Sequence, residues 1–385
     1  MKDKAKNTIK ALLSVNTFSN AFFYGKAGAR NREHLESLLV ELSSQDYLND
    51  VYPLKEFQER VRKEGSVIST FDVNWSNTHI YGIWQGIFGQ ECLAQKLFLP
   101  AVEHGLILHD DVFTDLRTTA RHTIVTFSEF RKKIIQRIIH RPVFCLGPYT
   151  HYCTGFYSDE RLEKEKKKFG KTLLVFPTHS TDTSELSIDQ MHFINNLSNI
   201  VKEYDSVLIN AFWWNINDPL IKQLEREGYK IISCGFRDDP MFLQRLKSYI
   251  QLSDFCIGDS IGTHVGYCVD AGVPFSYQNV GTNVILLKAE EKKTERYKKI
   301  QIEKIQSVFD NAVDINSEIM DIYNYYWGGN QIKSEGEIQA IKEISEELTK
   351  MDLGFTGRSN ANANKLLKKY NSEQPEKYRL LKEAL

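Results

Sequence analysis

The chain has 385 residues, and its 49 Lys and Arg nearly balance its 50 Asp and Glu, which gives a formal net charge of -1. Because a single hydrophobic core usually stops growing at roughly 250–300 residues, this length predicts two domains, and two domains can enclose a cleft. Charges of mixed sign exclude a basic nucleic-acid surface and an acidic disordered tail, so a small molecule is the favoured partner.

No apolar run reaches the roughly 20 residues of a membrane span, and the polar start from Met1 to Lys10 lacks the following apolar stretch of a signal peptide. We therefore expect a cytoplasmic protein. The six cysteines form no CxxC pair. Reduced and mostly buried thiols are expected instead of disulfides or a zinc site.

Residues 1–156 have the pattern of an α/β domain. Apolar residues at helical spacing predict a helix from Arg32 to Ser43. The expected elements that follow are a strand at Val67 to Val73, a packed helix within Ile80 to Phe98, a strand that starts at Leu97, a strand at Thr123 to Phe127, and a helix at Glu129 to Ile139 with Ser128 as its N-cap.

A cluster of acidic and histidine side chains follows the second predicted strand. Within nine positions the sequence places Glu103, His104, His109, Asp110 and Asp111. An imidazole beside carboxylates at a strand end suits a general base whose pKa lies near working pH, so His104, Glu103 and Asp110 are the catalytic candidates. A metal site is the alternative. The sequence lacks the helical pair of His four positions apart that zinc proteases use, so no metal ligand is assigned.

The charged run 157–171 separates two apolar regions and predicts a solvated helix or linker. From 172 to 285, strands alternate with helices, which is typical of a parallel sheet with right-handed crossovers. The expected order is strand Thr172 to Pro177, helix Asp189 to Glu203, strand Ser206 to Ala211, helix Pro219 to Glu227, strand Tyr229 to Cys234, helix Pro240 to Leu252, strand Asp254 to Ile257, and helix His264 to Ala271.

Polar loops follow four of these strands, at Thr178 to Asp182, Trp213 to Asn215, Gly235 to Asp239, and Gly258 to His264. Ligands of open α/β sheets bind outside the carboxyl ends of the strands, so we expect the four loops to converge on one site. The last loop leads into a helix whose first backbone N–H groups suit a phosphate. His179, Ser180 and Thr181 add donors for a phosphate or a ribose. An ordinary strand-to-helix joint is the alternative interpretation.

Three stretches stand out in this half: FPTHST, GFRDDPMFLQRLKSYIQLSDFCIGDS and GTHVGYCVDAGVPF. Together they resemble the donor-binding domain of GT-B glycosyltransferases, especially those encoded with bacterial capsule, O-antigen and related surface polysaccharides. The resemblance is close over Leu173 to Tyr277 and elsewhere rests on architecture alone. It implies two Rossmann-like domains that face a cleft, with 1–156 on the acceptor side and 172–285 binding a nucleotide-sugar donor.

By position, the resemblance implies that the donor is held by His179, Ser180, Asp259, Ser260, Gly262, Thr263 and His264. The donor is then a UDP- or CMP-linked sugar and the acceptor a saccharide or lipid-linked saccharide, with the base near His104 and no cofactor. Many retaining relatives carry an ExxxxxxE pattern near the phosphate loop, whereas Asp259 and Asp270 are spaced differently, which argues for inversion. The donor half has no DxD triplet, so metal-independent transfer is expected. A lipid-linked acceptor would place the enzyme at the inner face of the membrane.

The last region, 286–385, starts with a stretch rich in Lys and Glu and continues as helices, with a break at Trp327 to Asn330. In GT-B proteins the last helices commonly cross back to the first domain, and we expect the same here. An appended module that binds a partner is the alternative. For the activity, the alternatives are a nucleotide-sugar epimerase or hydrolase of the same fold and a non-catalytic binding or scaffold protein, because fold alone does not separate them.

Overall fold

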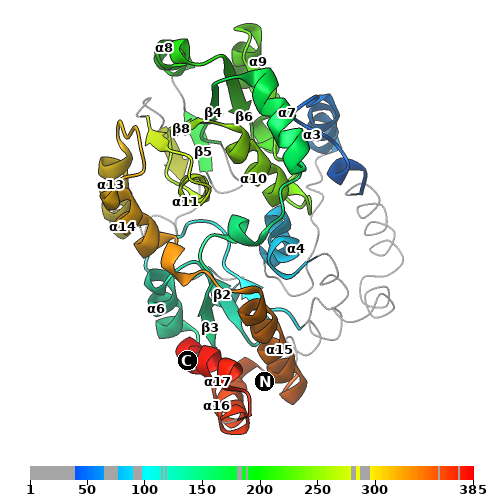
Figure 1. Cartoon of the computed structure of the whole chain (residues 1–385), viewed down its shortest axis with the longest axis vertical. Helices are drawn as coiled ribbons and strands as arrows, with labels where there is room; N and C mark the ends of the chain where they lie inside the picture. The colour runs from blue at the N-terminus through cyan, green and yellow to red at the C-terminus, as the bar shows by residue number, and fades with distance from the viewer. Residues whose placement is uncertain are drawn as a thin grey trace.

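The computed structural model has an α/β architecture, with a parallel sheet in each half of the chain and a helical C-terminal region (Figure 1). This confirms the expected fold class for the described residues, which are 40–64, 77–89, 98–113, 116–117, 119–179, 184–187, 190–278, 283–286, 295–353, 356–371 and 373–385. Most of the first predicted helix, the strand at Val67 to Val73, and the site residues Ser180 and Thr181 lie outside the described residues.

The first sheet has three parallel strands in spatial order β1 (Ala101–Val102), β2 (Ile124–Thr126) and β3 (Val143–Cys145). Every residue of the three strands is buried, as expected for a parallel sheet covered on both faces. Helix α6 (Glu129–Ile138) connects β2 to β3 and begins directly after Ser128, as predicted. It buries Phe130, Ile134 and Ile135.

The second sheet has five parallel strands in the order β7-β6-β4-β8-β9. They are β4 (Thr172–Phe176), β6 (Ser206–Asn210), β7 (Lys230–Ile232), β8 (Phe255–Gly258) and β9 (Phe275–Tyr277). The helices between them are α8 (Gln190–Ile200), α9 (Pro219–Arg226), α10 (Phe242–Leu252) and α11 (Thr263–Asp270), so the predicted alternation is confirmed. The chain builds β6 and β7 on one side of β4, then crosses to build β8 and β9 on the other. This reversal places the ligand-binding position of a doubly wound sheet between β4 and β8.

A small antiparallel pair lies beside this sheet. Strand β5 (Ser184–Ser187) follows the loop after β4 and pairs with β10 (Asn283–Leu286), which follows β9. The pair therefore joins the segment after β4 to the segment after β9.

The charged run between the two sheets forms helix α7 (Asp159–Phe169). Its N-cap is Ser158, whose hydroxyl accepts a hydrogen bond from the Arg161 backbone N–H. Phe169 and Glu165 are buried, and the helix packs against α10. The run is thus a docked helix, with its Lys-rich face in solvent as the sequence indicated.

Helix α3 (Tyr52–Glu64) packs on the second half of the chain, which differs from the expected domain 1–156. Its Phe57 ring lies 5.9 Å from Trp213 and 5.1 Å from Phe236, centroid to centroid. Lys55 Nζ also lies 2.8 Å from the Glu225 carboxylate. The physical reason is that helical periodicity reveals an apolar face but not the sheet that will cover it.

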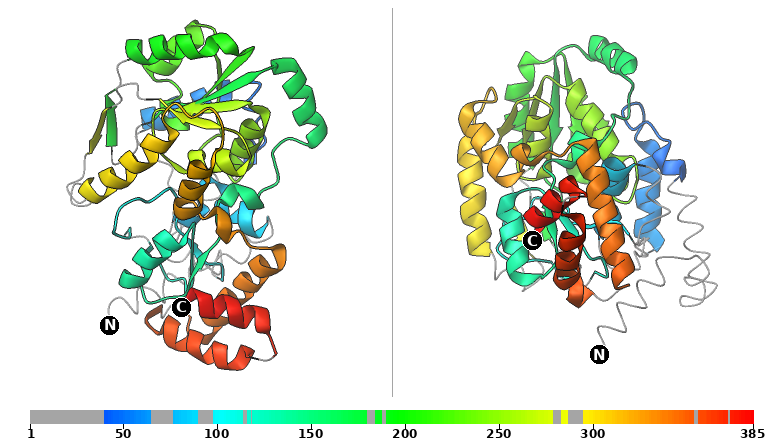
Figure 2. Two further views of the ribbon diagram at one scale, coloured as in Figure 1. Left: turned by 60° about the vertical axis from the view of Figure 1, so that its left-hand side comes forward. Right: turned by 60° about the horizontal axis from the view of Figure 1, so that its bottom comes forward.

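The C-terminal region consists of α13 (Glu295–Phe309), α14 (Ser317–Tyr326), α15 (Glu335–Met351), α16 (Ser359–Tyr370) and α17 (Pro375–Ala384). Figure 2 shows α15 to α17 grouped beside the first sheet, far from the second. Thr123 at the start of β2 donates from Oγ1 to Ser345 Oγ at 2.6 Å. Lys132 of α6 donates to the Glu383 backbone carbonyl at 2.6 Å.

The break after α14 is where the chain passes from the second half to the first. Trp327 is fully buried, and a Cβ on Gly266 of α11 would lie 2.1 Å from its ring. Gly328 has φ +69°, and a Cβ there would lie 2.2 Å from the Phe127 carbonyl oxygen at the end of β2. Only glycine fits this left-handed position at such a close approach.

The two sheets share one continuous apolar core through this junction. Phe127 stacks on Tyr149 at 4.2 Å and approaches Tyr267 of α11 at 6.4 Å. The described cysteines are buried free thiols, namely Cys145, Cys153, Cys234, Cys256 and Cys268. None of the described helices is both long and apolar enough to span a bilayer.

Candidate functional site

The carboxyl ends of β4 and β8 are tied together by one carboxylate. Asp259 follows β8 and is 8% exposed. Its Oδ1 accepts hydrogen bonds from the backbone N–H of Thr178, at 2.7 Å, and from the Thr178 hydroxyl, at 2.8 Å. Asp259, predicted as a donor ligand, therefore holds the two loops in place with this oxygen. The sequence interpretation placed Thr178 in a polar loop after a buried strand but assigned it no role in the site.

Helix α11 begins at this same position with Gly262 as its N-cap residue. The predicted strand, loop and helix are therefore present, and Ser260 and Thr263 are half-buried within the loop and the first helical turn. The first N–H groups of a helix have no partner inside the helix, and its dipole favours negative charge there. This edge of the sheet can accommodate an anion.

His264 lies in the first turn of α11 with its ring between two phenylalanines. The ring centroid is 4.8 Å from that of Phe176 and 5.5 Å from that of Phe275. Burial, then the neighbouring His179, lowers the pKa of His264 to about 4, although a hydrogen bond with the Ser260 backbone opposes the shift. The imidazole is therefore neutral at pH 7. Its Nε2 is buried and has no hydrogen-bond partner among the residues described.

His179 approaches from the loop after β4. It stacks on Phe212, which follows β6, with 4.0 Å between ring centroids and 20° between planes. His264 packs on Phe176, three residues before His179, so the two predicted imidazoles belong to the same edge of the sheet although they are far apart in sequence. A bound anion would favour the protonated form of His264.

The other two predicted loops are used for packing. After β6, Trp213 is buried against Phe57 and Phe236. After β7, Asp239 and Arg245 form a fully buried ion pair with 2.7 Å between Oδ2 and Nη1. Burial raises the pKa of Asp239, and Arg245 partly counters this shift. Of the four expected loops, those after β4 and β8 carry the predicted site residues, and the segment after β6 adds the Phe212 ring that stacks on His179.

Glu103, predicted as a catalytic residue, is held in a buried ion pair at the end of β1. It is 4% exposed, and its two oxygens accept from Arg131 Nη2 at 2.6 Å and Nε at 3.0 Å. The Thr126 hydroxyl adds a third hydrogen bond at 2.8 Å. A carboxylate with these partners has no free access to a substrate hydroxyl, so its role is structural. The sequence interpretation missed Arg131, which appeared as one of several cations on a basic helix.

The two other candidates of the first sheet, His104 and Asp110, differ in exposure. His104 is half-buried beside Tyr81, with 6.2 Å between ring centroids. Tyr81 donates its backbone N–H to the Arg237 carbonyl at 2.5 Å, so His104 lies where the two halves meet. Asp110 is exposed. Within the described parts of the chain, no three His, Cys, Asp or Glu side chains gather as a metal site would require.

Comparison with known proteins yields only distant structural likeness. No protein-family model and no curated protein matches the chain. Arabidopsis thaliana UGT89C1 aligns over 89% of this chain and 78% of its own, with a TM-score of 0.33 and 11% identity. The S. aureus MnaA-UDP co-structure aligns over 86% of this chain and 83% of its own, again with a TM-score of 0.33 and 11% identity. Scores of this size establish neither a family nor an activity, so the function has to be argued from the geometry of the chain itself.

Proposed function

We propose that this chain is a GT-B-type glycosyltransferase that moves a sugar from a nucleotide-sugar donor to a saccharide acceptor, without a metal and with inversion. The observation that supports this best is the β7-β6-β4-β8-β9 strand order, which brings His179, His264 and the start of α11 together between β4 and β8. Ligands of doubly wound sheets bind at this position.

The donor phosphates are assigned to the start of α11. The backbone N–H groups after Gly262 and the helix dipole supply positive potential there. His264 offers Nε2 as a hydrogen-bonding group in an environment with little water, where such bonds are stronger than at the surface. His179, with Ser180 and Thr181 beside it in the sequence, is assigned to the nucleotide or its leaving phosphate. Ser260 and Thr263 are assigned hydroxyl contacts.

The transfer step is an in-line displacement. An oxygen of the acceptor hydroxyl forms a bond to the anomeric carbon, the bond from that carbon to the phosphate oxygen breaks, and the electron pair leaves with the phosphate. The acceptor proton passes to a base, for which we assign His104 at the junction of the halves, with Asp110 as the second candidate. Backbone N–H groups and imidazoles stabilise the charge that develops on the leaving group.

The acceptor class follows from the resemblance of the donor half to enzymes of bacterial surface polysaccharide synthesis. A saccharide or lipid-linked saccharide is proposed, with UDP or CMP as the nucleotide. A lipid-linked acceptor would bring the enzyme to the inner membrane face.

Calorimetry with UDP, CMP, GDP and ADP tests the donor site directly, in buffer with and without EDTA. We expect one nucleotide to bind equally well in both buffers, and His179→Ala and His264→Ala each to weaken its binding by about 1.5–3 kcal/mol, the range for a hydrogen bond to a charged group. If folded, monodisperse protein binds none of the four, the donor site is wrong. Nucleotide release from a sugar donor without any acceptor would favour a hydrolase, and sugar interconversion without release an epimerase.

A further inference from the structure

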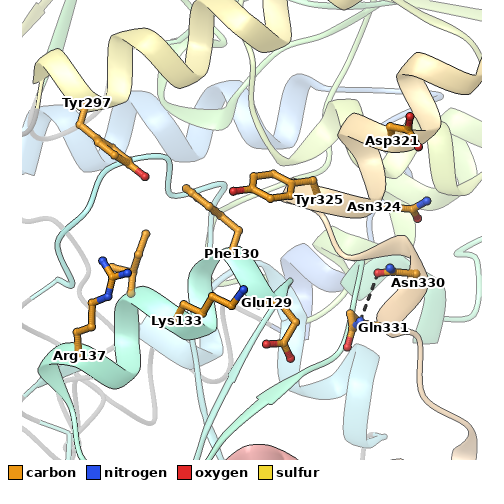
Figure 3. A pocket seen from close by; sticks show the side chains of 11 residues that line it. Glu129, Phe130, Lys133, Arg137, Tyr297, Asp321, Asn324, Tyr325, Asn330 and Gln331 are labelled. Carbon is orange, nitrogen blue, oxygen red and sulfur yellow. Dashed lines mark hydrogen bonds between the residues drawn. The ribbon is translucent and has the colours of Figure 1, made fainter.

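A pocket of about 460 Å³ lies away from the β4–β8 position, between α6 of the first half and α13 and α14 of the C-terminal region (Figure 3). Its walls come from three helices and from the 3-10 turn η6 (Gly329–Gln331) that follows the crossing point. None of its lining residues takes part in the donor site or the proposed transfer step.

The α6 wall of the pocket is cationic. Lys133 and Arg137 are one helical turn apart, exposed, and without an ion-pair partner among the described residues. Glu129 on the same helix also lines the pocket and pairs with Lys132, whose Nζ lies 3.0 Å from its carboxylate. Figure 3 shows Arg137 and Lys133 on α6 with their charged ends turned apart, the Lys133 amine toward Glu129, and Asp321 on the facing helix α14. An anionic group would therefore bind on the α6 side.

The rest of the pocket combines aromatic rings with amides. Tyr325 is 54% exposed although its ring centroid is only 5.4 Å from that of Phe130, so much of the ring faces the pocket or solvent. Tyr297 of α13 stands across the opening (Figure 3). The amides of Asn324 and Gln331 complete the lining. A pyranose ring has apolar C–H faces that pack on aromatic rings and hydroxyls that pair with amides, and this lining offers both kinds of contact.

The position of the pocket indicates which part of a substrate it could hold. One wall of the pocket is α6, the helix that connects β2 to β3 in the sheet whose β1 is followed by His104 and Asp110. A row of aromatic rings separates His264 of the donor site from Trp327 at the crossing point. It runs from His264 through Phe275 and Phe309 to Trp327, with centroid-to-centroid distances of 5.5, 6.0 and 6.5 Å. A ligand in the pocket would thus lie nearer the acceptor side than the donor phosphates.

We propose that this pocket is a binding site for an acidic sugar unit of the acceptor, remote from the reacting hydroxyl. The carboxylate pairs with Arg137 and Lys133, the ring packs on Tyr325 and Tyr297, and the hydroxyls reach the amides. A guanidinium suits a carboxylate because its planar N–H groups can donate two parallel bonds. The assignment to the acceptor depends on the proposed glycosyltransferase function, whereas the binding of an acidic saccharide does not.

The test measures saccharide binding by saturation-transfer NMR and calorimetry without nucleotide. The probes are tetragalacturonate and 3′-sialyllactose, with maltotetraose and lactose as neutral counterparts. We expect at least one acidic probe to bind about 10-fold more tightly than its neutral counterpart, a ratio that one charged hydrogen bond would supply, and to weaken as salt is raised. The double variant Lys133→Ala/Arg137→Ala should remove this difference, and Tyr325→Ala should weaken acidic and neutral probes alike.

The matched control is Lys164→Ala/Lys167→Ala on α7, which removes two exposed cations from a helix outside the pocket. It should bind every probe like the wild type. Three outcomes each overturn the proposal: no acidic probe binds the folded wild type, acidic and neutral probes bind equally, or the Lys133/Arg137 variant keeps full affinity. Nucleotide affinity is measured on the same samples. If the wild type binds nucleotide but no acidic saccharide, the proposal for this pocket is wrong and the donor site stands. If it binds an acidic saccharide but no nucleotide, the donor site is wrong and the proposal for this pocket stands.

Discussion

The Glu103–Arg131 pair allows a direct test of a structural role against a catalytic one, because the sequence predicted Glu103 to be catalytic. Glu103→Ala removes both carboxylate oxygens from a site where the two side chains are 3% and 1% exposed. Among the described residues, Arg131 would keep its bonds to the carbonyls of His109, at 2.6 Å, and Asp111, at 3.0 Å. A buried guanidinium without its counter-ion typically costs about 3–5 kcal/mol, so we expect a loss of that size in the free energy of unfolding.

The assay is urea unfolding followed by circular dichroism, run beside turnover measurements. Asp110→Ala is the matched control: it removes a carboxylate seven positions away that is exposed, and it should change the free energy of unfolding by no more than about 0.5 kcal/mol. The double variant Glu103→Leu/Arg131→Met should recover much of the stability lost in Glu103→Ala, since replacing a whole buried pair by apolar residues is often neutral. An unfolding free energy for Glu103→Ala within 1 kcal/mol of wild type, with turnover abolished, would refute the structural role and return Glu103 to catalysis.

His264 has a folded-state pKa of about 4, below its unfolded value of about 6.5, so its contribution to stability is complete above pH 6.5 and is lost as pH falls toward 4. The variant His264→Asn should therefore remove about 2–3 kcal/mol from the change in unfolding free energy between pH 7 and pH 4.5. An unchanged pH dependence in unfolding titrations would contradict this assignment. Gly266→Ala should lower the free energy of unfolding by about 1–3 kcal/mol in urea, because the new Cβ overlaps the Trp327 ring. Gly357→Ala is the control and should be nearly neutral, since a Cβ there meets no atom within 4 Å. Equal losses in the two variants would argue against the close approach of Gly266 to Trp327. His104→Ala should lower kcat by roughly 10²–10⁴-fold with nucleotide affinity unchanged, and a fully active variant would exclude His104 as the base.

Much of the second half could be predicted from the sequence because its signals are local. Buried parallel strands appear as short apolar runs, and glycine, proline and polar residues mark where they end. The expected strand at Thr172 to Pro177 is therefore found at Thr172–Phe176, and the expected helix at His264 to Ala271 is found at Thr263–Asp270. Helix α6 begins after Ser128 for the same reason. In each case the residues that decide the structure are neighbours in the chain.

Pairing between distant segments was decided by the tertiary structure. The periodicity of α3 predicts an apolar face. That this face packs against Trp213, about 150 residues away, depends on which of the two sheets the helix reaches in the folded chain. The acidic cluster after β1 had the composition of a catalytic site, yet the fold directs Arg131 onto Glu103 and leaves Asp110 in solvent. The placement of His179 and His264 at one edge of the sheet likewise depends on strand order, since β4 and β8 are adjacent only because strands are added on the other side of β4 after β7. Local sequence sets where elements begin and end. The chemistry of a side chain depends on its burial and its charge partners, and these arise from contacts that form only when distant elements pack.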